Sequence, residues 1–464
     1  MNNPYIQYMY SYPHKTAYGP LQDIWLDDYK SILQKPERVN SLYFHIPFCQ
    51  TKCGYCNLFS LPGQTEELME EYLGAMKRQA EQYAMQNIVF DDFIIGGGTP
   101  LILSEQALHR IFALSQNYFA WKENADIVIE TSPNQTTREK LNILKQHHVT
   151  RISIGVQSFQ EEELLALNRR HTAKQARKAL EDIRSLSFPC VNLDLIYGVP
   201  GQTLAKLEDS VHQAMEFEPD EVFAYPLYVK KGTYLSQQKQ QAMENTYEMY
   251  ELVRDMLLSY GYRQDSMRRF VRRHGWQSGT GKIKSDTTKY CAAENCMIKS
   301  YESCGFQNTI SIGCGGRSYI DNLHFCTPYG VTYAYCKKLL EQYINTENHR
   351  KITHGYILNE EEQKRRYVMK HILTRPGVCL KEYEKIYGGE LLQDFKQLVL
   401  WEEQGFATKQ NGYFGLTDKG LGLSDYLGPM LISREIKEKM QRFYEEGREE
   451  GKEDGSKNKN ANLL

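Results

Sequence analysis

Three cysteines lie close together near the start of the chain, in the stretch Cys49-Gln-Thr-Lys-Cys53-Gly-Tyr-Cys56. The C-x3-C-x2-C spacing puts their thiols on one tight loop, and an apolar run at residues 41–46 leads into this loop as a strand. Thiolates grouped in this way are typical ligands of iron–sulfur clusters. Three cysteines would hold three irons of a cubane, and the fourth iron would keep an open position, as catalytic metal sites do. On the spacing alone, a structural zinc site that lacks one ligand and a group of three buried thiols remain alternatives.

The composition limits the class of protein. With 464 residues, of which 41% are hydrophobic, the chain can form a large core and about two or three domains. A formal net charge of -2 gives no basic surface for bulk nucleic-acid binding. The apolar runs are too short for a membrane span and no secretory signal is evident, so we expect a cytoplasmic protein. Eleven cysteines, an odd number, favour a reducing compartment over a disulfide framework.

The elements that must position the cysteines alternate between strand and helix patterns. We predict six strands, at residues 41–46, 91–95, 126–130, 151–155, 191–196 and 221–226, with helices between them. The stretch 66–84 carries an amphipathic stripe that is typical of a surface helix. Alternating βα units favour an α/β fold with a parallel sheet, in which chemistry sits at the carboxyl ends of the strands.

Polar or glycine-rich motifs follow several of these strands. Gly96-Gly-Gly-Thr-Pro100 ends the second, and three glycines let a backbone approach a ligand closely. Glu130 ends the third strand, and Gln157, which can donate and accept hydrogen bonds, ends the fourth. Arg169 offers a cationic fork that suits a carboxylate. Asp194 lies within an apolar strand, where a carboxylate is costly unless it has partners. A solvated Glu130, or an Asp194 bonded to neighbouring backbone, is the structural alternative.

Taken together, these motifs resemble the radical S-adenosylmethionine (SAM) superfamily. The lead-in Tyr43-Phe-His-Ile-Pro-Phe48 and the stretch Gly155-Val-Gln-Ser158 are similar to its oxygen-independent coproporphyrinogen III oxidase branch, which also holds the HemW-type heme chaperones. The motifs cover about residues 41–230 in the order and spacing of that branch. The resemblance implies a partial (β/α)6 TIM-type barrel with a small C-terminal helical, winged-helix-like domain.

The same resemblance implies a [4Fe–4S] cluster and SAM as cofactors. The open iron would chelate SAM, and reductive cleavage would give methionine and a 5′-deoxyadenosyl radical that abstracts hydrogen from a tetrapyrrole or another carboxylated substrate. The electron would come from a flavodoxin- or ferredoxin-type donor. By this resemblance the metal ligands are Cys49, Cys53 and Cys56. The SAM-binding residues are Tyr43, Tyr55, Gly97, Gly98, Thr99, Glu130, Gln157, Arg169 and Asp194.

The resemblance also assigns parts of SAM to individual residues. The backbone at Gly97, Gly98 and Thr99 would receive the methionine amino group, and Arg169 would bind the methionine carboxylate. Asp194 would contact the ribose or the amino group. Asn168 stands where the branch has glycine before this arginine, which weakens the placement of Arg169. The resemblance names no residue that acts on the substrate.

One departure keeps the reaction open. The decarboxylating oxidases of this branch carry a fourth cysteine two residues after the third, and here that position is Leu58. A HemW-type heme chaperone without substrate turnover is therefore an alternative to an oxidase-like enzyme. A radical SAM enzyme that acts on a peptide or another metabolite is a further alternative.

The remaining chain is divided by composition into further segments. We expect an N-terminal arm at 1–40, a core and barrel extension at 41–345, a winged-helix-like domain at 350–440 and a disordered tail at 445–464. The arm includes Tyr10-Ser-Tyr-Pro13, which either covers the substrate pocket, as a similar stretch does in the oxidases, or packs as ordinary surface.

Two more stretches carry residues of possible chemical use. The basic run Met267-Arg-Arg-Phe-Val-Arg-Arg-His274 is either a solvated loop or a site that attracts a substrate with several carboxylates. Cys291, Cys296 and Cys304 are either reduced thiols or ligands of a second metal site.

Overall fold

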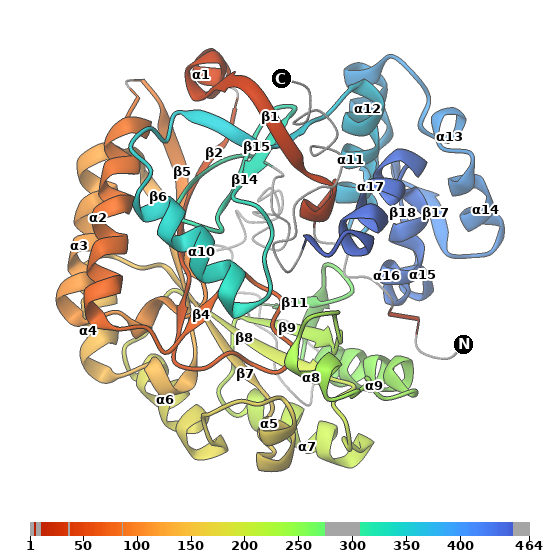
Figure 1. Cartoon of the computed structure of the whole chain (residues 1–464). Helices are drawn as coiled ribbons and strands as arrows, with labels where there is room; N and C mark the ends of the chain where they lie inside the picture. Colours follow the sequence, from red (N-terminus) through yellow and green to blue (C-terminus); the bar gives the residue numbers. More distant parts are fainter. Residues whose placement is uncertain (1–3, 6–10, 36–37, 86, 274–306, 449–464) are drawn as a thin grey trace.

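The computed structural model describes residues 4–5, 11–35, 38–85, 87–273 and 307–448. Figure 1 shows a curved sheet with helices on its outer side and a separate group of helices and short strands near the C-terminus. Within the described residues, none of the helices combines the length and the apolar character that a membrane crossing requires.

The six predicted strands form the centre of the fold. They lie side by side in chain order and every neighbouring pair is parallel. These strands are β2 (Asn40–Ile46), β5 (Val89–Gly97), β6 (Ala120–Thr131), β7 (Arg151–Gln157), β8 (Cys190–Tyr197) and β9 (Glu221–Pro226). The predicted α/β class is confirmed, as a partial barrel with a smaller C-terminal part.

The helices that connect the strands cover the outside of the sheet (Figure 1). They are α2 (Glu66–Tyr83), α3 (Glu105–Tyr118), α4 (Arg138–Gln146), α5 (Glu161–Ala166), α6 (Ala173–Ser185) and α7 (Leu204–Met215). Five of these helices begin at a Ser or Thr whose hydroxyl accepts a hydrogen bond from the third helical N–H, which satisfies a donor that the helix itself cannot.

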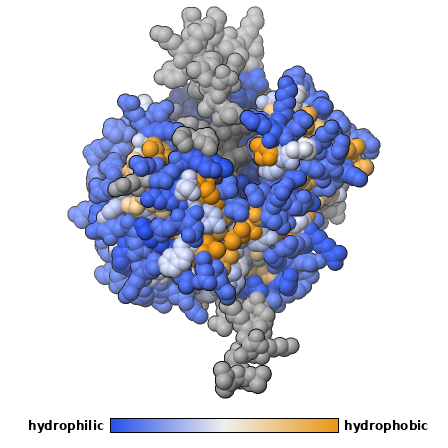
Figure 2. Space-filling model, turned by 90° about the horizontal axis from the view of Figure 1, so that it is seen from above, coloured by the Kyte–Doolittle hydropathy of each residue, from blue (hydrophilic) through white to orange (hydrophobic). Residues whose placement is uncertain are grey.

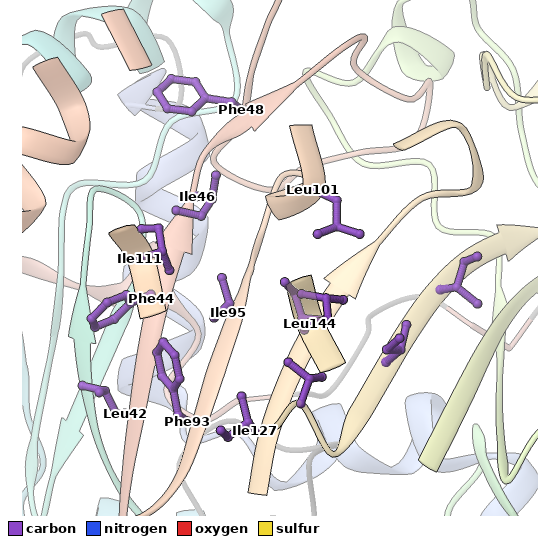
Figure 3. Close-up of a cluster of buried hydrophobic side chains, with 14 of the residues drawn as sticks. Leu42, Phe44, Ile46, Phe48, Phe93, Ile95, Leu101, Ile111, Ile127 and Leu144 are labelled. Carbon is purple, nitrogen blue, oxygen red and sulfur yellow. The ribbon is translucent and has the colours of Figure 1, made fainter. Parts of the chain in front are cut away.

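Apolar side chains from strands and helices meet in the layer between them (Figure 3). Phe44 of β2 and Phe93 of β5 are in edge-to-face contact, with ring centroids 4.8 Å apart. Ile111 of α3 and Leu144 of α4 complete this core and are almost fully buried. The packing fixes the strands, and through them the loops at their carboxyl ends.

Further strands extend the sheet at both edges, to thirteen in all among the described residues. Beyond β2 come β12 (Asn308–Ile312), β13 (Arg317–Ile320), β14 (Leu323–Cys326), β15 (Lys351–Ile357) and β1 (Gly19–Trp25). Beyond β9 come β11 (Arg269–Arg272) and β10 (Tyr262–Gln264). The analysis of the sequence did not predict β1, because its partner β15 lies far away in the chain and its own pattern is weak.

The C-terminal part has its own hydrophobic core and a three-stranded sheet in the order β16 (Val378–Cys379), β18 (Tyr413–Leu416) and β17 (Ala407–Gln410). The predicted hairpin joins the last two strands, and Asn411 and Gly412 have φ angles of 51° and 81°, as a type I′ turn requires. Its main helices are α11 (Glu360–Ile372), α12 (Leu380–Tyr387), α14 (Gln397–Glu403) and α17 (Arg434–Glu445), and α10 (Tyr333–Ile344) precedes it.

The predicted domain boundaries stay predictions. Most of the predicted tail, from residue 449 on, and Cys291, Cys296 and Cys304 lie outside the described residues.

The first two arginines of the basic run, Arg268 and Arg269, form neither a solvated loop nor an open anion site. Arg268 is 4% exposed and forms an ion pair with the buried Asp425 of the C-terminal part. Arg269 is also buried and pairs with Glu221 and Asp265. Both expectations for these two arginines were wrong, because the acids that neutralise them are far away in the sequence.

The ion pair between Arg268 and Asp425 should stabilise the contact between the barrel and the C-terminal part. We expect Asp425→Ala to lower the free energy of unfolding by about 3–5 kcal/mol, because it leaves a buried guanidinium without its carboxylate. Glu438→Ala, which removes an exposed pair with Arg434, should change it by less than about 0.5 kcal/mol. Urea unfolding followed by circular dichroism measures both, and equal effects of the two variants would contradict the structural role of the buried pair.

Candidate functional site

A cavity of about 950 Å³ lies inside the curve of the parallel sheet and opens at the carboxyl ends of its strands. Its lining includes every residue that the sequence analysis assigned to the cluster or to SAM. These are Cys49, Cys53, Cys56, Tyr43, Tyr55, Gly97, Gly98, Thr99, Glu130, Gln157, Arg169 and Asp194. The face of the molecule seen in Figure 2 is mainly hydrophilic, with a patch of hydrophobic side chains near its centre.

The cysteine loop is held at several points by backbone hydrogen bonds. Cys49 ends the short strand β3 (Phe48–Cys49), which pairs with β4 (Leu61–Pro62) on the far side of the loop. Within the loop, the N–H of Cys56 donates to the carbonyl of Cys53 at 3.1 Å, and the N–H of Gly54 donates to that of Leu167 at 2.8 Å. The loop is therefore anchored both to its own ends and to the segment after α5.

Each thiol has a different polar neighbour. Thr99 Oγ1 donates to Cys49 Sγ at 3.8 Å, and Arg169 Nη1 donates to Cys53 Sγ at 3.1 Å. Ser60 Oγ lies 4.0 Å from Cys56 Sγ. Burial raises the pKa of Cys49 to about 12 and also raises the pKa of Cys56. Metal binding would have to displace these protons.

No three His, Cys, Asp or Glu side chains in the described ranges converge on a single metal ion. A [4Fe–4S] cluster does not require such convergence, because each cysteine binds a different iron. The three thiols instead share one loop that opens into the cavity. This donor set, of thiolates without a fourth cysteine in the loop, suits a cluster with one open iron.

The glycine turn after β5 touches the cysteine loop directly. A Cβ at Gly98 would lie 2.5 Å from the carbonyl oxygen of Phe48 and 2.8 Å from Cys49 Sγ, so only glycine fits there. Gly97 has a φ of 117°, a conformation that favours glycine, and a Cβ on it would meet the ring of His45. The turn therefore forms a cradle of bare backbone beside the cysteines.

Two carboxylates face the same space from strands β6 and β8, which lie on either side of β7. The N–H of Gly97 donates to Glu130 Oε2 at 3.0 Å, which ties the end of β6 to the glycine turn. Asn192 Nδ2 donates to Asp194 Oδ1 at 2.7 Å. Burial raises the pKa of Glu130 and raises that of Asp194 to about 7, because the protein around the cavity disfavours the charged forms. A ligand that is cationic or that donates hydrogen bonds would favour the ionised form of these two carboxylates.

Some polar atoms in the cavity wall have no partner. Arg169 donates to Cys53 and to the carbonyl of Gly155, yet its Nε atom has no hydrogen-bond acceptor. Asn192 Oδ1 likewise has no donor. Buried polar groups are normally satisfied, so these atoms indicate that a polar ligand belongs here. The bare cradle and these atoms fit the cluster and SAM that the motifs imply.

The structure also adds cavity residues that the sequence analysis did not assign. His45 Nε2 lies 3.0 Å from the carbonyl oxygen of Phe59, and burial lowers the pKa of His45 to about 4, so its imidazole is neutral. Lys15, Lys230 and Arg317 line the part of the wall that comes from outside the six central strands. His45 belongs to the stretch Tyr43–Phe48 and Lys15 follows the stretch Tyr10–Pro13, but neither stretch showed that these side chains face the cavity.

Comparisons of the sequence and of the fold with known proteins agree with the resemblance that the motifs indicate. Residues 43–214 match the family model described as the Radical SAM superfamily. The chain is 25% identical over 409 residues to the heme chaperone HemW of Lactococcus lactis, covering 85% of this chain and 97% of that protein. It is 24% identical over 436 residues to the oxygen-independent coproporphyrinogen III oxidase of Escherichia coli, covering 89% of this chain and 91% of that protein. In fold it resembles a solved structure of coproporphyrinogen III oxidase (HemN) from Escherichia coli, with a TM-score of 0.73 at 21% identity over 91% of this chain and 96% of the other.

The cysteine assignment can be tested by removing single thiols. We expect Cys49→Ala, Cys53→Ala and Cys56→Ala each to abolish a [4Fe–4S] centre after anaerobic reconstitution, because each removes the ligand of one iron. Cys190→Ala and Cys379→Ala serve as controls and should keep the centre, since neither residue lines the cavity. Iron counting and EPR measure the result, and a normal cluster in the Cys53 variant would contradict the assignment.

The SAM assignment predicts a dependence on pH. Because the pKa of Asp194 is raised to about 7, its carboxylate is ionised above that pH and protonated below it. SAM affinity should therefore fall as the pH drops from 8 to 6 (about one unit on either side of that pKa), and Asp194→Asn should remove most of this dependence. At pH 8 we expect Asp194→Asn and Arg169→Ala to weaken SAM binding by about ten- to a hundredfold while iron content stays unchanged.

Calorimetry on the reconstituted protein measures these affinities. Lys174→Ala, on the outer surface at α6, is the matched control and should bind SAM like the parent. Unchanged SAM affinity in both the Asp194 and the Arg169 variants would show that SAM does not bind in this part of the cavity.

Proposed function

The chain carries a radical SAM domain, and from that premise we propose that it holds a [4Fe–4S] cluster and SAM and acts on a tetrapyrrole or a similarly carboxylated substrate. When bound, the cluster and SAM would supply reductive cleavage of SAM, and with it radical chemistry able to abstract hydrogen from a substrate. A flavodoxin- or ferredoxin-type protein in the cytoplasm would provide the electron. The related heme chaperones and coproporphyrinogen oxidases make a tetrapyrrole the first ligand to test.

The residues of this chain would bind and orient these groups. Cys49, Cys53 and Cys56 would hold the cluster, while Arg169, whose guanidinium already touches Cys53 Sγ, would bind the SAM carboxylate beside it. Asp194, within β8, would accept hydrogen bonds from SAM. Tyr43 and Tyr55 would pack against SAM and limit the access of water to it.

One observation carries the proposal. The cysteine loop, the glycine cradle and the polar strand ends, which are separate in the sequence, line one cavity. Its volume of about 950 Å³ lies near the upper end of small-molecule sites, which run to about 1,000 Å³, and leaves room for a substrate beside SAM. The arrangement therefore supports chemistry on a second molecule rather than SAM binding alone.

A second candidate is a heme carrier of the HemW type. Leu58 lines the cavity next to the cysteine loop and is 43% exposed, where the decarboxylating oxidases have a cysteine. An apolar side chain at this place favours contact with the apolar body of a large ligand over another cluster ligand. The similarity to a heme chaperone across 97% of that protein points the same way.

The two candidates predict different products. For the enzyme, we expect reductive SAM cleavage to 5′-deoxyadenosine in anaerobic assays with dithionite, but little protoporphyrinogen from coproporphyrinogen III, because Leu58 replaces the oxidase cysteine. Chromatography of nucleosides and porphyrins measures both products. Cys53→Ala, which should lack the cluster, is the control and should form no 5′-deoxyadenosine.

The opposite outcomes separate the candidates. Rapid decarboxylation of coproporphyrinogen III would show that Leu58 does not exclude oxidase activity. Stoichiometric heme binding and transfer to an acceptor, with negligible 5′-deoxyadenosine under all conditions, would assign the chain to the carriers.

A further inference from the structure

A buried carboxylate, Glu163 of α5, lies close to the cavity without forming part of its lining. The residue is 2% exposed and is not among those that line the cavity. In the described part of the chain, no basic side chain forms a salt bridge with Glu163, and Lys206, whose charge acts on it, pairs with Glu162 instead. A carboxylate buried in this way is costly unless hydrogen bonds compensate for the lost water. The donors that reach Glu163 therefore indicate its role.

Two loops are joined at this carboxylate. Ser158 Oγ donates to Glu163 Oε2 at 2.6 Å, and Gln202 Nε2 donates to the same oxygen at 2.9 Å. Ser158 directly follows β7, and Gln202 lies in the loop that follows β8, the neighbouring strand. Burial raises the pKa of Glu163, and the hydrogen bonds from these two donors oppose the rise. One carboxylate oxygen thus links the segments that follow two parallel strands.

The residue before Ser158 is Gln157, which lines the cavity and has an unusual backbone. Its φ is 72°, in the left-handed region that residues with a side chain seldom adopt. The pairing of β7 with β8 shifts between Gly155 and Gln157, which marks a β-bulge. The side chain is turned back over the strand, since a Cβ on Gly155 would lie 2.6 Å from Gln157 Nε2. Such a conformation persists only where its surroundings hold it, and the bond from Ser158 to Glu163 fixes the next residue.

On the other side, Gln202 holds the backbone where β8 ends. Its Oε1 accepts hydrogen bonds from the N–H of Gly198 at 2.7 Å and from the N–H of Val199 at 3.4 Å. Gly198 directly follows β8, the strand that carries Asp194 into the cavity. Glu163 is therefore linked, through one residue on each side, to the ends of both strands.

We propose that Glu163 is a positioning residue for SAM, which holds Gln157 of β7 and Asp194 of β8 in the mutual arrangement that binds SAM and does not itself touch SAM. The inference rests on the proposed function, because it takes the cavity to hold SAM between these strand ends. It assigns to a residue outside the cavity lining a part in the affinity for SAM.

The first test measures SAM affinity by calorimetry on the full-length, reconstituted protein. Glu163→Leu removes the acceptor of both hydrogen bonds and should weaken SAM binding by about three- to thirtyfold, the range of coupling through packed networks. Glu163→Gln keeps an oxygen for both donors and should bind SAM nearly as well as the parent. The matched control is Glu362→Leu, at a carboxylate that is also 2% exposed and accepts a hydrogen bond from Tyr12, and it should bind SAM like the parent.

A double-mutant cycle separates positioning from a general loss of stability. Gln157→Asn shortens the amide side chain and keeps a residue type that tolerates a positive φ. If Glu163 acts through Gln157, the loss of SAM affinity in the double variant should be smaller than the product of the two single losses. A loss equal to that product would overturn the inference.

Hydrogen exchange of the backbone gives a readout that needs no SAM. In the reconstituted protein without SAM, Glu163→Leu should speed the exchange of the N–H groups of Gln160 and Gly198, which donate to Ser158 Oγ and to Gln202 Oε1. The conservative variant and the matched control should exchange both groups at the rate of the parent. Unchanged exchange in Glu163→Leu would show that the carboxylate does not hold the two loops, and would overturn the inference.

If Glu163→Leu does not fold, Ser158→Ala takes its place. This variant removes only the bond on the side of β7, so it should weaken SAM binding and speed the exchange of Gln160 but not that of Gly198. Equal exchange of both groups with the parent, or SAM affinity equal to that of the parent, would overturn the inference.

The same samples distinguish this inference from the proposed function. If the parent binds SAM and Glu163→Leu binds it equally well, the positioning role fails and the proposed function stands. If the parent binds no SAM although exchange in both loops depends on Glu163, the proposed function fails, while the link between the two loops stands.

Discussion

The site depends on the parallel pairing of six consecutive strands. Because parallel strands end on the same edge of a sheet, the residues that follow each strand meet there even when they are far apart in the chain. At Gly98 the glycine turn packs so tightly on the cysteine loop that a single methyl group would collide with Phe48 and Cys49. The position of the cysteine loop therefore depends on the register between β2 and β5, which pairs Phe44 with Ile95 and Ile46 with Gly97.

Much of this part of the fold could be predicted from local sequence. An apolar run such as 151–155 that leads into Gln157 carries its own strand pattern, and the cysteine and glycine motifs are contiguous. The predicted helix 66–84 is α2, because its stripe of apolar residues and the cap at Thr65 act within one element. Such features need no information about distant partners. Short-range patterns were therefore enough to predict the strands and loops on which the candidate site residues lie.

The parts that were missed depend on contacts across hundreds of residues. Strand β1 forms because it pairs with β15, and Arg268 is buried because Asp425 neutralises it. Neither partner is visible from the local pattern, and a basic run without its acids resembles a solvated loop. The same limitation applies to Lys15, whose position depends on packing against α17 near the other end of the chain.

This division follows the architecture of the cavity. The residues assigned to the cluster and to SAM all lie within 43–214, the stretch that matches the radical SAM family model. The opposite wall comes from other segments, with Lys15 before this stretch and Lys230, Arg317 and Tyr444 after it. The stretch that matches the family model thus carries all the residues assigned to the cofactors, while segments outside it build the opposite wall. The chemistry that sets the substrate of this protein is therefore to be sought in that second wall, which Lys15, Lys230 and Arg317 help to line.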